Sequence, residues 1–93
     1  MSVLNGPAAF DSVDISTAEE LKVGANRLDG RRVVSIQPLD GDIHLGFDNT
    51  VSATKRAMTI RKGQFIEREA SDQLAIWIIA DTGTVKVNIA EIG

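Results

Sequence analysis

The chain has 93 residues and a net charge of −3, and it contains no cysteine, which excludes disulfides, thiolate metal sites and cysteine nucleophiles. Its length fits one domain, and 43% hydrophobic with 25% charged residues is an ordinary globular composition. Basic residues are dispersed and aromatic residues are few, so no nucleic-acid partner is expected. The longest apolar run, Leu74–Ala80, is too short to span a membrane, and the amino terminus lacks the pattern of a signal peptide.

The first eleven residues are small, apolar and irregular, with the turn-prone Asn5-Gly6-Pro7 in their middle. Three interpretations compete: a frayed terminus, an arm that lies on a neighbouring protein, or a strand of the fold. Several of these side chains are more apolar than a solvated tail requires. We therefore expect an arm over residues 1–11 and one sandwich domain over residues 12–93. The expected partner contacts in the arm are Val3, Leu4, Pro7 and Phe10.

Alternating apolar residues predict a strand over Ser12–Ser16. Ser16 and Glu19 could form a capping box that opens a helix. The apolar pattern ends near Gly24, which is too early to support an isolated helix. A strand followed by a loop is therefore favoured, and a single helical turn is the alternative.

The stretch Arg31–Phe47 reads as two strands joined by a tight turn at Asp40-Gly41, which predicts a β-hairpin. Glycine at the bend supplies the positive φ that hairpin turns favour. Pro38 cannot donate a ladder hydrogen bond, so the first strand ends there or lies at an edge. In the second strand, alternation directs Phe47 toward the core and His44 toward the outer face.

The second half of the chain continues the pattern of short strands separated by turns. A weak strand is expected over Val51–Lys55, then strands over Met58–Ile60 and Phe65–Glu69. Leu74–Ala80 is apolar on both faces and should lie centrally in a sheet. Gly83 is expected in the left-handed region, closing a last hairpin with Thr84–Ile89.

About seven or eight short strands with almost no helix predict an all-β fold, either an antiparallel β-sandwich or a jelly-roll-like small barrel with an extended amino-terminal arm. One face of each strand supplies the predicted core. Its expected members are Ile36, Ile43, Leu45, Phe47, Ile76, Ile78, Val85, Val87 and Ile89.

Residues suited to catalysis or metal binding are few. His44 is the only histidine and is expected to be an ordinary surface residue, because no second soft ligand is available. Asp40 and Asp42 could be read as a calcium or acid–base pair, but turn chemistry explains both. No phosphate loop, nucleophile elbow or zinc-binding helix motif occurs. We therefore expect no enzymatic activity, no cofactor and no metal.

Two basic groups and one tryptophan remain to be placed. Arg31-Arg32 and the cluster Lys55–Lys62 could bind phosphate, but acidic residues follow closely, and a solvated or partner-facing surface is the better interpretation. Trp77 points away from the core if Ile76 and Ile78 face it. It is then either covered by loops or exposed as an oligomer contact.

Two segments together resemble a set of small tailed-bacteriophage virion proteins. The first contains Asn26 and Arg31-Arg32-Val33-Val34-Ser35-Ile36-Gln37-Pro38, then Ile43-His44-Leu45-Gly46-Phe47. It is similar to the family patterns N-x-x-R-R-x-x-x-I-Q-N and V-Y-L-G-F. The second, Ile76 to Glu91, is similar to I-x-A-I-A-x-x-G-T-x-x-V-x-V-x-E. The likeness covers residues 26–91 and consists of strand patterns and turn glycines.

This resemblance implies a non-enzymatic virion component on the outer capsid surface, made in the host cytoplasm. A capsid decoration (cement) protein that binds the major capsid protein is its first implication. A tail or head-fibre accessory module that binds a receptor or glycan is the alternative. Edge strands of the predicted sheets need covering, so a homo-oligomer, a symmetric dimer or trimer, is expected. Pro38 replaces the usual Asn, His44 replaces the common Tyr, and Lys55–Lys62 is more basic than the usual loop.

Overall fold

The computed structural model describes residues 6–93, which form eight β-strands. All strand pairings are antiparallel. The strands are β1 (Ala8–Ile15), β2 (Glu19–Glu20), β3 (Val33–Pro38), β4 (Ile43–Gly46), β5 (Met58–Ile60), β6 (Ile66–Glu69), β7 (Trp77–Ala80) and β8 (Val85–Ile92).

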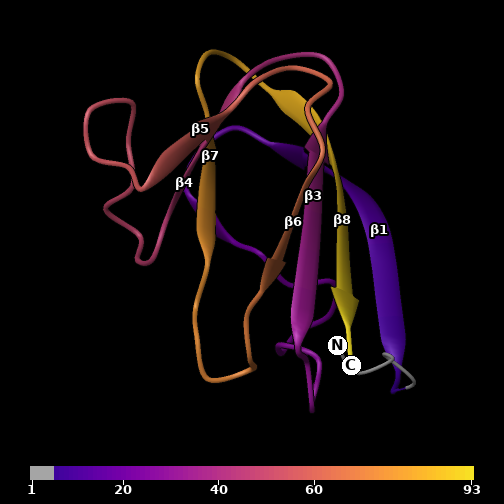
Figure 1. The fold of residues 1–93 in the computed structure, drawn as a ribbon. Coiled ribbons are helices and arrows are strands. Elements are labelled where there is room, and N and C mark those ends of the chain that lie inside the picture. The colour runs from indigo at the N-terminus through magenta and orange to yellow at the C-terminus, as the bar shows by residue number, and fades with distance from the viewer. Residues whose placement is uncertain (1–5) are drawn as a thin grey trace.

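The strands form two four-stranded sheets that pack face to face (Figure 1). Sheet A has the order β1-β8-β3-β6, and sheet B has the order β2-β7-β4-β5. The expected antiparallel sandwich is therefore confirmed, and the fold is not a closed barrel. β7 lies inside sheet B, as its two apolar faces predict.

Both predicted hairpins are wrong. β3 lies in sheet A and β4 in sheet B, and β7 and β8 are divided between the sheets in the same way. Each turn therefore carries the chain across the core instead of back along the same sheet. A hairpin within one sheet and a turn between two sheets show the same alternation of apolar residues. The alternation indicates only which face of each strand is buried.

The glycine at the first of these turns serves close packing instead of backbone conformation. Gly41 does not have a positive φ, and a Cβ placed on it would lie 2.7 Å from Cγ2 of Val85. The predicted positive φ at Gly41 is therefore wrong. At the second turn Gly83 has a φ of 60°, which confirms the left-handed conformation expected there.

The core lies between the sheets and contains every predicted member except Phe47, whose side chain is 56% exposed. β4 ends at Gly46, and Val51 packs so closely there that a Cβ on Gly46 would lie 2.9 Å from its Cβ. The alternation that directed Phe47 inward stops with the strand. The weak strand expected over Val51–Lys55 is also absent, and Ser52 and Lys55 instead bond to each other through a turn.

Strand β1 begins earlier than the sequence indicates. Residues 8–11, assigned to the arm, pair with β8 as part of the sheet, while Val3 and Leu4 lie outside the described residues. The helical turn considered after Ser16 is not formed; Glu19–Glu20 instead pairs with β7. Within residues 6–93, no helix is long and apolar enough to cross a membrane.

Candidate binding surface

The outer face of sheet A carries the most exposed large apolar side chain of the described residues. Phe10 on β1 is 83% exposed, and Phe65, just before β6, is 58% exposed. Their strands lie at the two edges of the sheet. Between them the floor is low, because Ala90 of β8 and Ser35 of β3 are small and lie opposite each other in the register.

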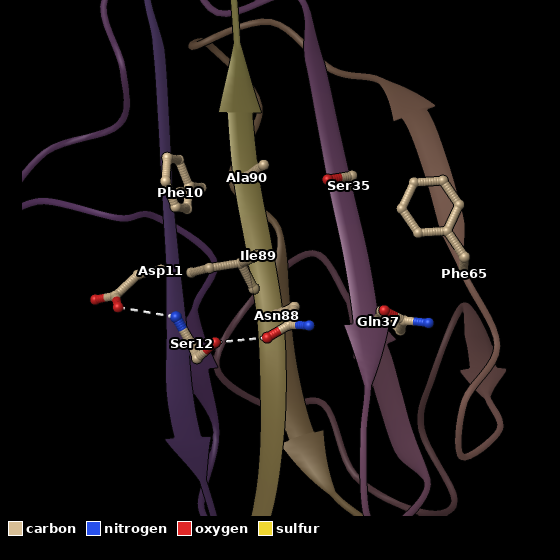
Figure 2. A pocket seen from close by; sticks show the side chains of 9 residues that line it. All are labelled: Phe10, Asp11, Ser12, Ser35, Gln37, Phe65, Asn88, Ile89 and Ala90. Carbon is tan, nitrogen blue, oxygen red and sulfur yellow. Dashed lines mark hydrogen bonds between the residues drawn. The ribbon is translucent and has the colours of Figure 1, made fainter.

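This arrangement forms a shallow depression of about 380 Å³, which we call the sheet A depression (Figure 2). It takes residues from three strands and from the loop that leads into the fourth. The lining residues are Phe10, Asp11, Ser12, Ser35, Gln37, Phe65, Asn88, Ile89 and Ala90.

A row of polar side chains crosses the depression. Ser12 lies opposite Asn88, and Asn88 lies opposite Gln37 on the next strand. Ser12 Oγ donates to Asn88 Oδ1 at 2.5 Å, and Gln37 Nε2 donates to the carbonyl of Gly63 at 3.3 Å. The remaining amide atoms, Nδ2 of Asn88 and Oε1 of Gln37, have no hydrogen-bond partner among residues 6–93. The depression therefore presents one donor group next to one acceptor.

Among the described residues, the other two expected contacts, Trp77 and Pro7, do not join this surface. Trp77 lies on β7, where Ile78 faces the core, so Trp77 faces outward from sheet B on the opposite side of the sandwich from Phe10. It is half-buried. Pro7 lies at the end of sheet A, where its carbonyl accepts a hydrogen bond from the N–H of Gly93 at 2.8 Å. Phe10 was predicted from the sequence as a contact residue, but Phe65 was not. Successive side chains of a strand point to opposite faces, so an inward-facing Ile66 would have placed Phe65 on the outer face.

His44 differs from the expected surface residue. It points to the outer face of sheet B, yet it is only 5% exposed. Its Nε2 lies 2.7 Å from Oδ1 of Asp81, and its Nδ1 lies 2.9 Å from Oγ1 of Thr59. A carboxylate only accepts, so Nε2 carries a proton, and in the neutral ring Nδ1 accepts from the threonine hydroxyl. The sheet A depression does not reach this chain of three groups.

Arg31 is buried, which contradicts both interpretations of the Arg31-Arg32 pair for this residue. It is 1% exposed and donates to Oε2 of Glu91 at 2.9 Å. Its Nε and Nη2 donate to backbone carbonyls, and both Glu91 oxygens also accept backbone N–H groups. The carbonyls belong to Ala70, Ser71 and Leu74, and the N–H groups to Val23 and Leu28. These two charges hold two irregular segments on the core.

The carboxylates on either side of Gly41 accept hydrogen bonds from backbone N–H groups. Asp40 accepts the N–H of Lys86, and Asp42 accepts the N–H of Lys62, both at 2.8 Å. That N–H, together with the guanidinium of Arg61, lowers the pKa of the Asp42 carboxyl. Among the described residues, no group of three or more histidine, cysteine or acidic side chains is placed to hold a metal ion.

The comparisons with known proteins give no relative. No family model matches the chain, and no curated protein or solved structure matches it either. Of the residues on which the expected resemblance rests, Arg31 and Glu91 form the buried pair and Gly83 lies in a turn. These residues explain how the chain folds, so the function has to be argued from its surfaces.

Proposed function

We propose that the chain is a non-enzymatic structural protein of a tailed-phage virion that decorates the outer head shell. The observation that supports this most is the outer edge of β1. Among residues 6–93 this strand pairs only with β8, and its eight residues make it longer than the other edge strands, β6, β5 and β2. An unpaired edge of this length can accept a strand from another protein.

The other edges are less suited to such a contact. β6 carries Glu67, Arg68 and Glu69, and charged side chains of this kind prevent edge pairing. On β1, the carboxylate of Asp11 accepts the N–H of Ser12 at 2.8 Å and so occupies one backbone donor. The amino-terminal half of β1 is therefore better suited to pair with a strand of another protein. This half also directly continues the proposed arm in the sequence.

In this proposal the arm, with Val3, Leu4 and Pro7, and the adjoining Phe10 contact the major capsid protein. Binding only to the assembled shell would stabilise that state by mass action. A homo-oligomer, a dimer or trimer, would bring several arms to neighbouring capsid subunits. The half-buried Trp77, on the opposite side of the sandwich, is the candidate contact between copies.

The test is cosedimentation with empty head shells of the virus that encodes the chain, after measurement of the native mass. Deleting residues 1–5 removes the part of the arm that contains Val3 and Leu4 but leaves β1 complete, because the pairing with the last residue begins at Gly6. We expect this variant and Phe10→Ser to stay in the supernatant while the parent protein pellets. Phe47→Ser changes another exposed phenylalanine, which directly follows β4 of sheet B, and should still pellet. Pelleting of the arm deletion at parental occupancy contradicts the proposal.

A second candidate function is a tail or head-fibre accessory module that binds a receptor or glycan. The specific observation in its favour is the sheet A depression, where aromatic rings and unpaired amide atoms lie together. Binding to host cells in the absence of shell binding would favour this candidate.

A further inference from the structure

The two unpaired amide atoms of the sheet A depression lie on directly opposed residues of neighbouring strands. Asn88 and Gln37 are register partners in the pairing of β3 with β8. Figure 2 shows the nitrogen of Asn88 on the side of Gln37 and the oxygen of Gln37 on the side of Asn88. Side chains at opposed positions have Cβ atoms about 5 Å apart. The donor Asn88 Nδ2 and the acceptor Gln37 Oε1 are therefore close enough for one small polar group to bond to both.

Neighbouring bonds fix the orientation of both amides. Ser12 Oγ holds the oxygen of Asn88, which leaves its NH₂ group pointing along the row. The carbonyl of Gly63 holds the NH₂ group of Gln37, which leaves its oxygen pointing back. Both groups are therefore positioned before a ligand arrives, which reduces the entropy lost on binding.

The rings supply the second component. Phe65 directly continues the row that contains Gln37, since Ile36 pairs with Ile66. Phe10 stands in the next row, opposite Ala90, on the far edge strand. The two edges are three strand spacings apart, roughly 14 Å. An extended ligand of a few rings can therefore contact both phenylalanines, with the small residues Ala90 and Ser35 beneath it.

The charges around the depression select against an anionic ligand. Asp11 is the only charged lining residue, and its carboxylate is turned to the N–H of Ser12. Lys86, a cation on this face, lies one row further along from Asn88 and is paired with Asp14 at 3.3 Å. No lining residue is basic, so an anionic group would lie near a carboxylate with no cation to balance it.

We propose that the sheet A depression binds a neutral oligosaccharide. Adjacent hydroxyls of a sugar ring fit the site, one accepting from Asn88 Nδ2 and the other donating to Gln37 Oε1. The apolar C–H face of a sugar stacks on an exposed aromatic ring, as for other ligands that combine apolar and polar faces. This inference supplies the ligand class of the second candidate function and rests on it for the biological setting alone. Shell binding through Val3, Leu4 and Pro7 would use other residues, and Phe10 is shared by the two proposals.

The test is an NMR titration of the full-length ¹⁵N-labelled protein with cellotetraose, maltotetraose and chitotetraose. We expect at least one to shift the side-chain amide signals of Asn88 and Gln37 in a saturable way, in the millimolar range that suits an open site. The absence of a saturable shift with all three sugars overturns the proposal. Equal or tighter binding of the anionic 3′-sialyllactose overturns the assignment to neutral sugars.

Matched variants separate the site from a general loss of folding. Asn88→Asp removes the donor with almost no change in shape, and we expect at least a tenfold loss of affinity for the sugar. Gln37→Met removes the acceptor, and Phe65→Ala removes the ring, with losses of similar size. Asn49→Asp, the same chemical change on an exposed turn outside sheet A, should bind as the parent does. Unchanged affinity in Asn88→Asp contradicts the proposal.

The two proposals fail in different ways. Phe65→Ala should lose the sugar and still pellet with head shells, whereas deletion of residues 1–5 should lose the shells and still bind the sugar. If Phe65→Ala stops pelleting and no sugar binds, the depression contacts a protein, and the oligosaccharide inference is wrong.

Discussion

The Arg31–Glu91 pair and the sheet A depression place side chains at opposite extremes of exposure. The charged pair is almost completely buried, while Phe10 and Phe65 are mostly exposed. Charged residues are rarely buried unless they are paired, and a large apolar side chain left in water gives up the stabilisation of burial. The comparison suggests that the charges serve the fold and that the exposed rings serve binding.

The buried pair has a function that apolar residues could not supply. In a simple buried ion pair, replacement by apolar side chains is often neutral or stabilising. In this protein the two side chains also bond to five backbone groups in two irregular segments, residues 23–28 and 70–74. A buried backbone group without a partner costs about 1–3 kcal/mol. The pair therefore replaces secondary structure in segments that have little of it.

The largest effect is expected from Arg31→Ala. It leaves the buried Glu91 carboxylate without its counter-charge and removes the side-chain donor from three carbonyls, and breaking a buried pair costs about 3–5 kcal/mol. Urea unfolding should detect this as a large fall in the free energy of unfolding, or as a protein that does not fold. Arg68→Ala, at an exposed arginine, should change stability by less than about 0.5 kcal/mol. Similar losses in both variants would show that the burial of Arg31 is unimportant.

The double variant Arg31→Met, Glu91→Leu sharpens this test. If the pair contributes only through its mutual attraction, apolar replacement should restore parental stability. We expect no such recovery, because the backbone groups of Val23, Leu28 and the 70–74 segment remain unsatisfied. Recovery to the parental free energy of unfolding would show that the hydrogen bonds from the pair to the backbone add nothing to stability.

A smaller effect is expected at the close contact between the sheets. Gly41→Ala places a methyl group 2.7 Å from Cγ2 of Val85, and overpacking of this kind costs about 1–3 kcal/mol. Thermal or urea unfolding measures the loss. Adding Val85→Ala should make the Gly41→Ala change nearly neutral, and a double-mutant cycle quantifies this coupling. Additive losses would indicate that backbone conformation, and not the contact, requires glycine.

The acidic side chains at the turns predict a dependence on pH. The pKa of Asp42 is lowered from its ordinary value of 3.8, first by the N–H of Lys62 and then by Arg61. Below 3.8 the unfolded chain binds the proton more readily than the folded protein does. The stabilisation from Asp42 is thus present above pH 3.8 and is lost as the pH falls through the lower folded value.

Asp42→Asn should therefore reduce the fall in unfolding free energy below pH 3.8 while keeping an acceptor for Lys62. The measurement is urea unfolding at a series of pH values. Asp29→Asn is the control, since no described residue donates a hydrogen bond to Asp29. An unchanged acid dependence in Asp42→Asn would show that this carboxylate does not contribute to it.

The strands that form the interior of each sheet could be predicted from the sequence. The reason is that apolar residues occur where a strand side chain is buried. This alternation identified β7, β8 and eight of the nine proposed core residues. The predictions that were wrong concern contacts between residues far apart in the sequence. The burial of Arg31 requires Glu91, which lies sixty residues further along the chain. The division of each predicted hairpin between two sheets likewise depends on which strands pair, and no local pattern contains that information.

The candidate binding surface was only partly visible for the same reason. Phe10 could be noticed as an apolar residue in a region without a clear pattern, but Phe65 joins it only through the order β1-β8-β3-β6. Asn88 and Gln37 lie far apart in sequence and become neighbours through the pairing of β3 with β8. Polar residues on strand exteriors are common, so neither one marks a site on its own.

The smallest effect on stability is expected from Phe10→Ser and Phe65→Ser. Both rings are mostly in water, so removing them should change the free energy of unfolding by no more than about 0.5 kcal/mol. Ile36→Ala, at a fully buried position of the same sheet, should cost about 2–5 kcal/mol and serves as the contrast. A loss of several kcal/mol in either phenylalanine variant would mean that the ring supports the fold. Its exposure would then no longer argue for binding. Near-parental stability, measured beside a loss of shell or sugar binding, would assign these rings to function.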